Sequence, residues 1–207
     1  MKQLIVSLCL GSMLLVGCGI VSSGIHPITD GFHKNLPQQN ARIVVWGGYP
    51  SSTGTAMTWL QKRGLTIVER ARLKQILDEQ TIRLTHTQDD EGQILRVGKL
   101  LGAETVVFVD SSFNTGATSN FSVNPSGGGG HSTTIYSLSV SIRGVNVETG
   151  EVAWTGNARY PRPVVNLDDG LTRLTCNALA TAWGLRPTGE YDWKGKSACE
   201  IESPASP

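Results

Sequence analysis

Two short runs of large apolar side chains constrain the fold of this 207-residue chain more than any other feature. Residues 43–46 (IVVW) and 106–109 (VVFV) contain no polar side chain, which is typical of strands buried on both faces of a sheet. Between them, Leu73, Ile76 and Leu77 follow the i, i+3, i+4 spacing of an amphipathic helix. Buried strands that alternate with helices predict an α/β fold, with a mixed β-sheet flanked by helices.

The same spacing, together with glycines that end helices, predicts four helices. They are a helix that follows Pro50 and ends at Gly64, one that begins near Glu69, a short one that ends at Gly102, and one over residues 167–183. Further strands are predicted at residues 65–68 and on both sides of a tight turn at residues 148–150.

Residues 111–134 differ in character from the rest of the chain. Of these 24 residues, 18 are Ser, Thr, Asn or Gly, and none carries a formal charge. Such a composition predicts a flexible insertion within a long hairpin, with residues 127–130 (GGGG) as a flexible loop tip. These glycines lack the following Gly-Lys-Ser/Thr sequence that a phosphate-binding loop requires.

The strand that follows this insertion changes its apolar side. Leu138, Val140 and Ile142 have one parity, whereas Val145 has the other. The change falls at Gly144, which predicts either a β-bulge that shifts the register or a passage from one-sided to two-sided burial.

The N-terminus has the pattern of an export signal. Lys2 precedes an apolar run over residues 4–16, and the sequence LVGC at residues 15–18 resembles a bacterial lipobox. We therefore expect residues 1–17 to be a signal peptide and Cys18 to carry lipid, whose acyl chains would anchor the protein. Because Gly19 follows instead of aspartate, we expect attachment to the outer membrane, facing the periplasm.

The remaining organisation follows from composition. We expect residues 18–41 to be the lipidated cysteine and a tether, residues 42–184 the α/β domain, and residues 185–207 a C-terminal tail. A tether over residues 19–41 could reach at most about 80 Å. Without the signal peptide, 17 of the 18 basic residues remain against 17 acidic ones, so charge predicts no binding to nucleic acid.

Two thiols other than Cys18 remain after export, those of Cys176 and Cys199. In an oxidising compartment they are a candidate disulfide that would fasten the tail to the last helix and stabilise the fold by about 3 kcal/mol. The alternative is a small buried Cys176 and a free thiol at Cys199.

No motif in the sequence predicts an enzyme, a cofactor or a metal site. The four histidines, at positions 26, 33, 86 and 131, lack metal-ligand spacing. Asp89, Asp90 and Glu91 lack the alternating ladder of a calcium loop and are predicted to form a solvated turn. No serine or cysteine has the surroundings of a nucleophile. The tryptophans at positions 46, 59 and 154 are predicted to lie in the core or at a subunit contact.

Three segments resemble the periplasmic domain of the curli-secretion lipoproteins, the CsgG family. They are residues 67–80 (IVERARLKQILDEQ), residues 97–107 (VGKLLGAETVV) and residues 145–152 (VNVETGEV). The resemblance extends over about residues 41–184. It implies a lipid-anchored domain of the outer membrane that assembles into a ring, and in the secretion proteins each subunit adds two hairpins to a transmembrane pore.

This chain departs from that pattern, because only residues 111–142 could form a membrane hairpin. About ten residues separate the strand around Trp154 from the last helix, too few for a second hairpin. We therefore expect a periplasmic homo-oligomer, or the partner of an envelope protein, that is an accessory or ring component in secretion of curli-like surface material. The alternatives are a regulator of penicillin-binding synthases and a pore-forming subunit of a secretion channel.

Overall fold

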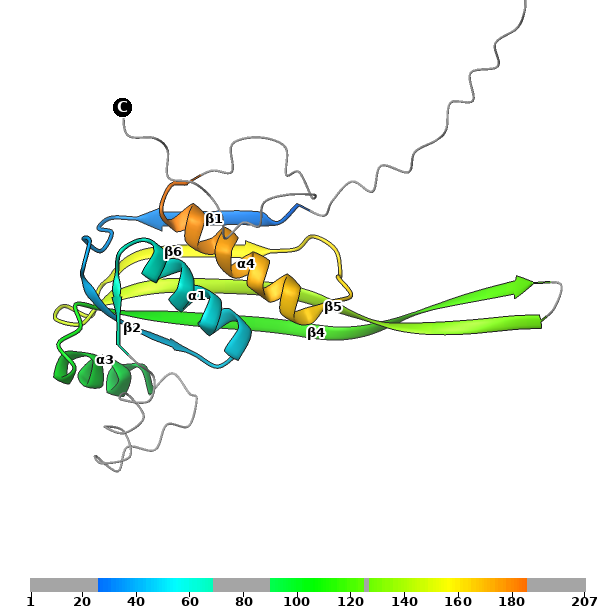
Figure 1. The fold of residues 1–207 in the computed structure, drawn as a ribbon, viewed down its shortest axis with the longest axis horizontal. Coiled ribbons are helices and arrows are strands. Elements are labelled where there is room, and N and C mark those ends of the chain that lie inside the picture. Colours follow the sequence, from blue (N-terminus) through cyan, green and yellow to red (C-terminus); the bar gives the residue numbers. More distant parts are fainter. Residues whose placement is uncertain (1–25, 69–89, 125–126, 186–207) are drawn as a thin grey trace, which may run out of the picture.

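The structure is a computed structural model that describes residues 26–68, 90–124 and 127–185. Six strands form one mixed sheet in the order β1-β6-β5-β4-β2-β3 (Figure 1). Along β1-β6-β5-β4 each strand is antiparallel to the next, whereas β2 is parallel to both β4 and β3. Their bounds are β1 Ile28–His33, β2 Arg42–Gly47, β3 Thr66–Ile67, β4 Thr105–Asn124, β5 Gly127–Asn146 and β6 Val152–Arg159.

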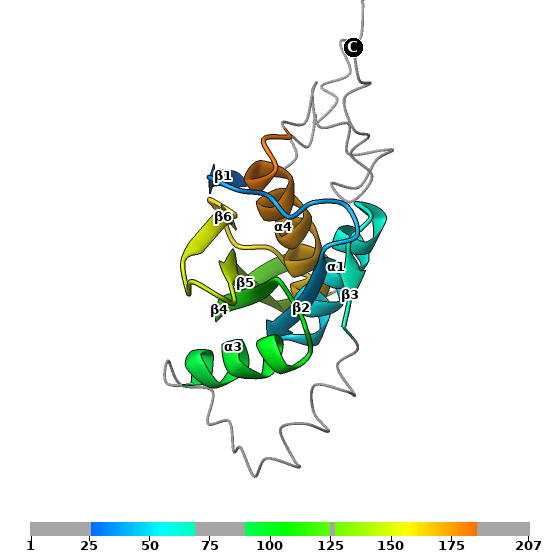
Figure 2. The same ribbon diagram turned by 90° about the vertical axis from the view of Figure 1, so that its left-hand side faces the viewer.

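Helices cover both faces of this sheet unequally. The helices α1 (Pro50–Lys62) and α4 (Leu167–Ala182) lie side by side on one face, and α3 (Asp90–Leu100) lies on the other (Figures 1 and 2). Each ends where the sequence predicts, with positive φ at Gly64, Gly102 and Gly184. The predicted α/β fold with a helix-flanked mixed sheet is confirmed. The helix predicted from Glu69 falls outside the described residues.

Two apolar cores separate the layers. The larger one lies under α1 and α4, where Trp154 is fully buried and its ring stands edge-on to that of Trp183, with centroids 4.7 Å apart. The second core lies under α3 and contains Val44, Val106 and Ile94. The strands β2 and β4 contribute to both cores, as their unbroken apolar runs predict. Trp59 is buried and Trp46 is half-buried, so the three predicted core tryptophans lie in or against a core.

The N-terminal boundary of the domain was predicted wrongly. Residues 28–33, which the sequence places in the tether, form β1 and pair with β6 from Ile28↔Arg159 to His33↔Trp154. All six residues are exposed, and Phe32 remains 56% exposed. The strand is held by its backbone at the sheet edge, which leaves little apolar signal in the sequence. The ordered domain therefore begins at least as early as Ile28.

The parity change at Gly144 has both of the predicted causes. The register between β5 and β6 shifts between Gly144 and Val145, so a bulge is present. Pairing of β5 with β4 continues through this point without a shift, and Val145 packs in the core under α3. The strand thus passes from burial on the α4 side alone to burial on both sides.

The segment predicted to be a flexible insertion consists of paired strands. Pairing of β4 with β5 runs from Thr105↔Asn146 to Asn124↔Gly127, so residues 127–130 belong to a strand and are not a loop tip. Backbone hydrogen bonds form a ladder whatever the side chains are, and threonine favours strands. A polar, glycine-rich composition was therefore a poor guide to the backbone here.

The prediction of a solvated acidic turn at residues 89–91 is wrong for Asp90 and Glu91, which belong to a helix. The helix α3 begins at Asp90, and Glu91 is bonded through both carboxylate oxygens to the guanidinium of Arg143 on β5. One of these bonds, from Nη1 to Oε2, measures 2.9 Å. The Arg143 guanidinium also lies over the Phe108 ring, 4.9 Å from its centroid. This ion pair connects the first turn of α3 to β5 on the face of the sheet that α3 covers.

The Glu91–Arg143 pair predicts acid-sensitive stability. The hydrogen bond from Arg143 lowers the pKa of Glu91, although desolvation opposes it. A carboxylate with a lowered pKa stabilises the fold above its unfolded pKa of about 4.3 and loses this contribution as pH falls through the folded pKa. We expect Glu91→Gln to lower the free energy of unfolding by about 1–2 kcal/mol at pH 7 and by much less below about pH 4.

Urea unfolding between neutral and acidic pH measures this difference. Glu148→Gln is the matched control, because Glu148 bonds Lys99 at 2.6 Å but both side chains are well exposed. The control should change stability by less than about 1 kcal/mol at any pH. A Glu91→Gln effect that persists unchanged in acid would contradict the assignment.

Candidate interaction surface at the hairpin arm

The part of the β4–β5 hairpin beyond the rest of the sheet is the candidate functional surface. We call residues 113–124 and 127–138 the arm. Val109 is the last residue of β4 that pairs with β2, and Ser139 is the first residue of β5 that pairs with β6. Beyond these points the two strands pair with each other and project away from the helices (Figure 1). Twelve residues per strand correspond to a length of about 40 Å.

Within the described residues, both long edges of the arm lack a paired strand over most of their length. At the root of the β5 edge, Tyr136 and Val164 exchange backbone hydrogen bonds of 2.7 and 2.9 Å, and the Leu138 carbonyl accepts from the Tyr160 amide at 3.2 Å. Edge strands that avoid pairing usually carry charges, prolines or bulges. Residues 111–124 have no charged side chain and no proline, and the register is continuous. These edges are therefore suited to pairing with another strand.

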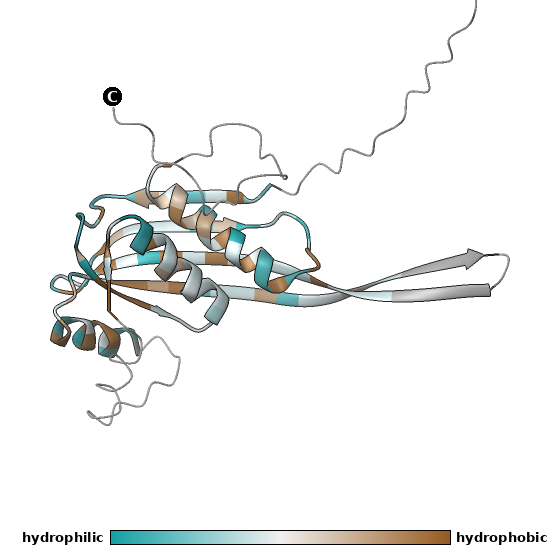
Figure 3. Ribbon diagram, viewed as in Figure 1, coloured by the Kyte–Doolittle hydropathy of each residue, from teal (hydrophilic) through white to brown (hydrophobic). Residues whose placement is uncertain are grey.

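The two faces of the arm differ moderately in polarity. Register places Phe113, Ala117 and Tyr136 on the face that continues the α4 side, and Asn114 and Thr118 on the other. Phe113 is 40% exposed. The hydropathy of the described part of the arm is mostly intermediate, in contrast to the apolar strands of the domain (Figure 3). The arm thus lacks a continuous apolar stripe over residues 113–119.

The root of the arm is fixed to the helix layer. The Tyr49 ring stands edge-on to Phe113, with centroids 5.8 Å apart, and Ser111 Oγ donates to Ser52 Oγ at 2.7 Å. Burial, and then the Asp168 carboxylate, raise the pKa of the Tyr49 phenol. The arm therefore leaves the domain in a defined direction at the N-terminal ends of α1 and α4.

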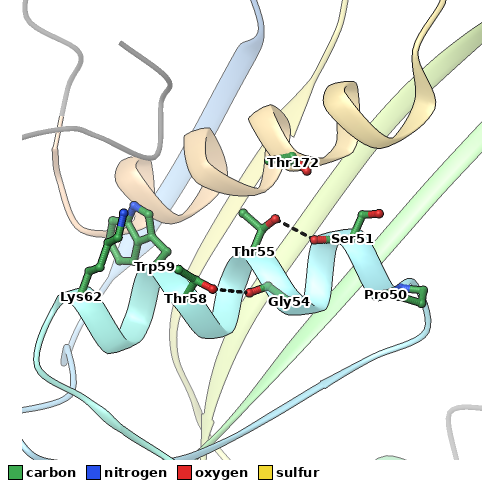
Figure 4. Close-up of a pocket in the computed structure, with 8 residues that line it drawn as sticks. All are labelled: Pro50, Ser51, Gly54, Thr55, Thr58, Trp59, Lys62 and Thr172. Atoms are coloured by element: carbon green, nitrogen blue, oxygen red, sulfur yellow. Dashed lines mark hydrogen bonds between the residues drawn. The ribbon is translucent and has the colours of Figure 1, made fainter.

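A groove between α1 and α4 was the other candidate site. It has a volume of about 410 Å³ and is lined by seven residues of α1, three of which bear hydroxyls, and by Thr172 of α4 (Figure 4). Thr55 Oγ1 donates to the Ser51 carbonyl at 2.7 Å, and Thr58 Oγ1 donates to the Gly54 carbonyl at 3.0 Å. These two hydroxyl hydrogens are thus used within the helix and are not donated into the groove.

The comparison with known families agrees with the predicted resemblance. The sequence model of the curli production assembly/transport component CsgG matches residues 56–159, which are 104 of the 207 residues. The chain belongs to the CsgG family. The match runs from within α1 to the end of β6 and so includes the arm. Membership supports an accessory role in assembly or transport at the cell envelope, and the family description is not that of an enzyme.

Solved structures resemble this CsgG-family chain only distantly. The PelC dodecamer from Paraburkholderia phytofirmans is 13% identical over 75% of this chain and 96% of its own, with a TM-score of 0.44. The LpoB C-terminal domain from Salmonella enterica is 14% identical over 63% and 88%, with a TM-score of 0.46. Lipoprotein GNA1162 from Neisseria meningitidis is 16% identical over 70% and 99%, with a TM-score of 0.42. No curated protein matches the sequence.

The predicted site residues of this CsgG-family chain are only partly described. Cys18 and Cys199 lie outside the described residues, so lipidation and the pairing of Cys199 stay predictions. Cys176 lies on α4, is fully buried and is disulfide-bonded. Among the described residues, no group of three His, Cys, Asp or Glu could hold a metal ion. Within the same ranges, no helix is both long and apolar enough to cross a membrane.

Sequence reasoning missed the contacts that orient the arm. Tyr49, Ser52 and Asp168 carry no motif, and the partners of the first two are more than 55 residues away. The uncharged composition of residues 111–134 was the one usable signal. It indicated a special segment within the predicted long hairpin, which is confirmed, but did not indicate that the pairing continues as far as Asn124↔Gly127.

Proposed function

We propose that the protein is a lipid-anchored periplasmic protein of the bacterial outer membrane. In this proposal it is a ring or accessory component in the secretion or assembly of curli-like surface material. Membership of the CsgG family and the expected lipidation of Cys18 support this role. The observation that carries the proposal is the β4–β5 arm with its two open, uncharged edges.

The arm supplies the contact between copies. Its two edges are unlike, since one belongs to β4 and the other to β5. Pairing of the β4 edge of one copy with the β5 edge of the next is a head-to-tail contact, which closes into a ring when the rotation allows. A two-stranded ribbon alone is marginally stable in water, so pairing with neighbours also stabilises the arm.

The position of β1 limits how far the domain can lie from the membrane. If lipid is attached at Cys18, ten residue steps to Ile28 reach at most about 34 Å. This is less than half of the reach that a tether over residues 19–41 would give. A short reach suits a component that works at the outer membrane surface, and it disfavours a regulator of penicillin-binding synthases, which must act across the cell wall.

A pore-forming subunit is the second candidate, because the arm is long enough. A membrane-spanning strand needs about 9–11 residues, and each strand of the arm has twelve. The chain supplies one such hairpin, since only the seven residues 160–166 connect β6 to α4. The mixed polarity of residues 113–119 counts against insertion, so we rank the accessory or ring component first.

Shortening the arm tests the proposal. Residues 117–134 can be replaced by Asn-Gly, which joins the paired residues Gly116 and Ile135 through a two-residue turn. We expect the full chain in mild detergent to form oligomers and the shortened chain to be monomeric. Mass photometry measures the assembly, and a thermal melt verifies that the shortened domain is folded.

Point variants give a matched comparison in the full chain. Ala117 is exposed on the arm, and Thr66 is exposed on the edge strand β3 at the opposite side of the sheet. Because lysine protects strand edges from pairing, Ala117→Lys should weaken assembly and Thr66→Lys should leave it intact. Oligomers that survive arm shortening would refute the arm as the contact. Dye release from liposomes by the wild-type oligomer, abolished by shortening, would favour the pore.

A further inference from the structure

The strand β1 forms one edge of the sheet. It lies at the edge farthest from α3 and pairs with β6 on its inner side (Figures 1 and 2). Among the residues that the structure describes, no strand pairs with its outer side. Two large apolar side chains of this strand, those of Phe32 and Ile28, are 56% and 47% exposed. An open strand edge with exposed apolar side chains is a template for pairing with another strand.

The side chains of β1 divide between the two faces of the sheet. A Cβ built on Gly31 would lie 2.9 Å from the Thr181 methyl carbon of α4, so the odd-numbered residues of β1 face α4. Asp30 and Phe32 therefore face the other side, and Lys34, one step beyond the strand, keeps their parity. All three are exposed. The core under α3 contains no residue of β1 or β6, so the described helices leave this part of the face uncovered.

The backbone of β1 directs its unpaired groups outward at odd-numbered positions. The Lys34 amide donates to the Ala153 carbonyl of β6 at 2.9 Å, so Lys34 directs its backbone groups toward β6. Because this direction alternates along a strand, Thr29, Gly31 and His33 direct their backbone groups away from β6. A strand that adds to this edge must therefore bond to these three residues.

A second copy of β1 can pair antiparallel with the first in three registers that use at least two of these residues. Each register has a twofold axis, so the same residues of the two copies oppose each other in reverse order. An axis at Asp30 sets the two Asp30 carboxylates opposite each other, which is repulsive. An axis at Gly31 sets Asp30 of each copy opposite Phe32 of the other. Neither register matches the side chains.

The third register, with its axis at Phe32, is complementary. It sets the two Phe32 rings opposite each other, and it sets Asp30 of each copy opposite Lys34 of the other. Gly31 and His33 supply the hydrogen-bonded pairs of this register. The opposed rings and charges therefore lie at non-hydrogen-bonded pairs, where Cα atoms are about 4.5 Å apart and side chains are closest. Asp30 thus favours this register and opposes the one centred on itself.

We propose that β1 is a contact between two copies of this protein, which pair antiparallel about a twofold axis at Phe32 and join their sheets into one. This contact is isologous, so it differs from the head-to-tail contact of the arm. It involves one short strand of each copy, which is less surface than stable complexes bury. The dimer therefore dissociates at the nanomolar concentrations of mass photometry and forms at about 50 µM or above. Attachment of both copies to one membrane, which rests on the proposed lipid anchor, raises their effective concentration and favours the pair.

A cysteine on the twofold axis tests the contact in the full chain, in mild detergent at about 100 µM protein. Oxidation of Phe32→Cys should link two copies, because Cα atoms about 4.5 Å apart are within disulfide range. Asp30→Cys is the matched control on the same face. Its two substituted positions are four residues apart along the paired strands, or about 14 Å, which is beyond that range. Non-reducing electrophoresis measures the linked dimer, and wild type treated in parallel reports links through native cysteines.

We expect Phe32→Cys to give at least about fivefold more linked dimer than Asp30→Cys or wild type. Equal yields from the two cysteine variants would overturn the proposal. A Phe32→Cys adduct with a chain of different mass, formed by oxidation in cells, would assign this edge to another envelope protein and would equally overturn pairing between copies.

Charge reversal tests the register in the Phe32→Cys background. Asp30→Lys or Lys34→Asp alone sets like charges opposite each other twice, so each should lower the yield of linked dimer by about fivefold or more. The two reversals together restore opposite charges and should restore the yield. Single reversals without effect, or a double reversal that remains as poor as either single one, would refute the register. Replacement of residues 117–134 by Asn-Gly should leave the linked dimer intact, which separates this contact from that of the arm.

Discussion

Gly156→Ala is expected to unfold most of the domain. The methyl group would lie 2.0 Å from the Ala178 carbonyl oxygen and 2.7 Å from the carbonyl carbon, and both atoms belong to the helix backbone. On its own side, Gly156 pairs with Gly31 of β1 and with Ile142 of β5, so β6 is held on both edges and cannot withdraw. Overpacking typically costs about 1–3 kcal/mol of stability. Here neither the backbone of α4 nor that of β6 can move aside, so the cost should exceed that range.

Urea unfolding followed by tryptophan fluorescence measures this loss, because Trp154 is buried in the core under α4 and contacts the ring of Trp183, the C-cap residue of that helix. Gly54→Ala is the control of opposite sign. Gly54 lies inside α1, and nothing within 4 Å would meet its Cβ, so alanine should stabilise the domain by about 0.5–1 kcal/mol. A Gly156→Ala protein as stable as wild type would mean that α4 does not lie this close to β6.

The sequence predicts well those parts of the fold in which the local pattern and the packing agree. Strands such as β2 and the start of β4 are buried on both faces, so their apolar runs identify them directly. The helix ends follow from glycines that adopt positive φ. In both cases the local sequence and the tertiary structure impose the same requirement, so local patterns are sufficient.

The errors have the opposite cause. The strand β1 has no buried side chain, and the arm consists of polar residues, so backbone pairing alone defines them. Glu91 looked like part of a solvated turn because its partner, Arg143, is 52 residues away. For the candidate surface, the family resemblance and the unusual composition of residues 111–134 were readable. The open edges were not, since they depend on where β2 and β6 end.

The pair formed by Gly144 and Trp154 should be strongly coupled. These residues are directly opposite on β5 and β6, and a Cβ on Gly144 would lie 2.1 Å from two atoms of the Trp154 indole. The indole is fully buried and stands edge-on to Trp183, so it has little room to move aside. Gly144→Ala alone is therefore expected to cost about 3 kcal/mol. Trp154→Ala alone, which leaves a large cavity, is expected to cost about 3–5 kcal/mol.

The double variant decides whether the glycine exists to admit the indole. With Trp154 already replaced by alanine, the methyl group of Gly144→Ala enters the vacated space, so the second substitution should add little further loss. The combined cost should fall short of the sum of the two single costs by about 1–3 kcal/mol, measured as free energies of unfolding in urea. Additive costs would show that Gly144 is required for the β5–β6 register shift itself and not for the tryptophan. This shift lies where β5, the strand that continues into the arm, becomes covered on both faces. Comparison of the single and double variants therefore tests how β5 is packed in the domain.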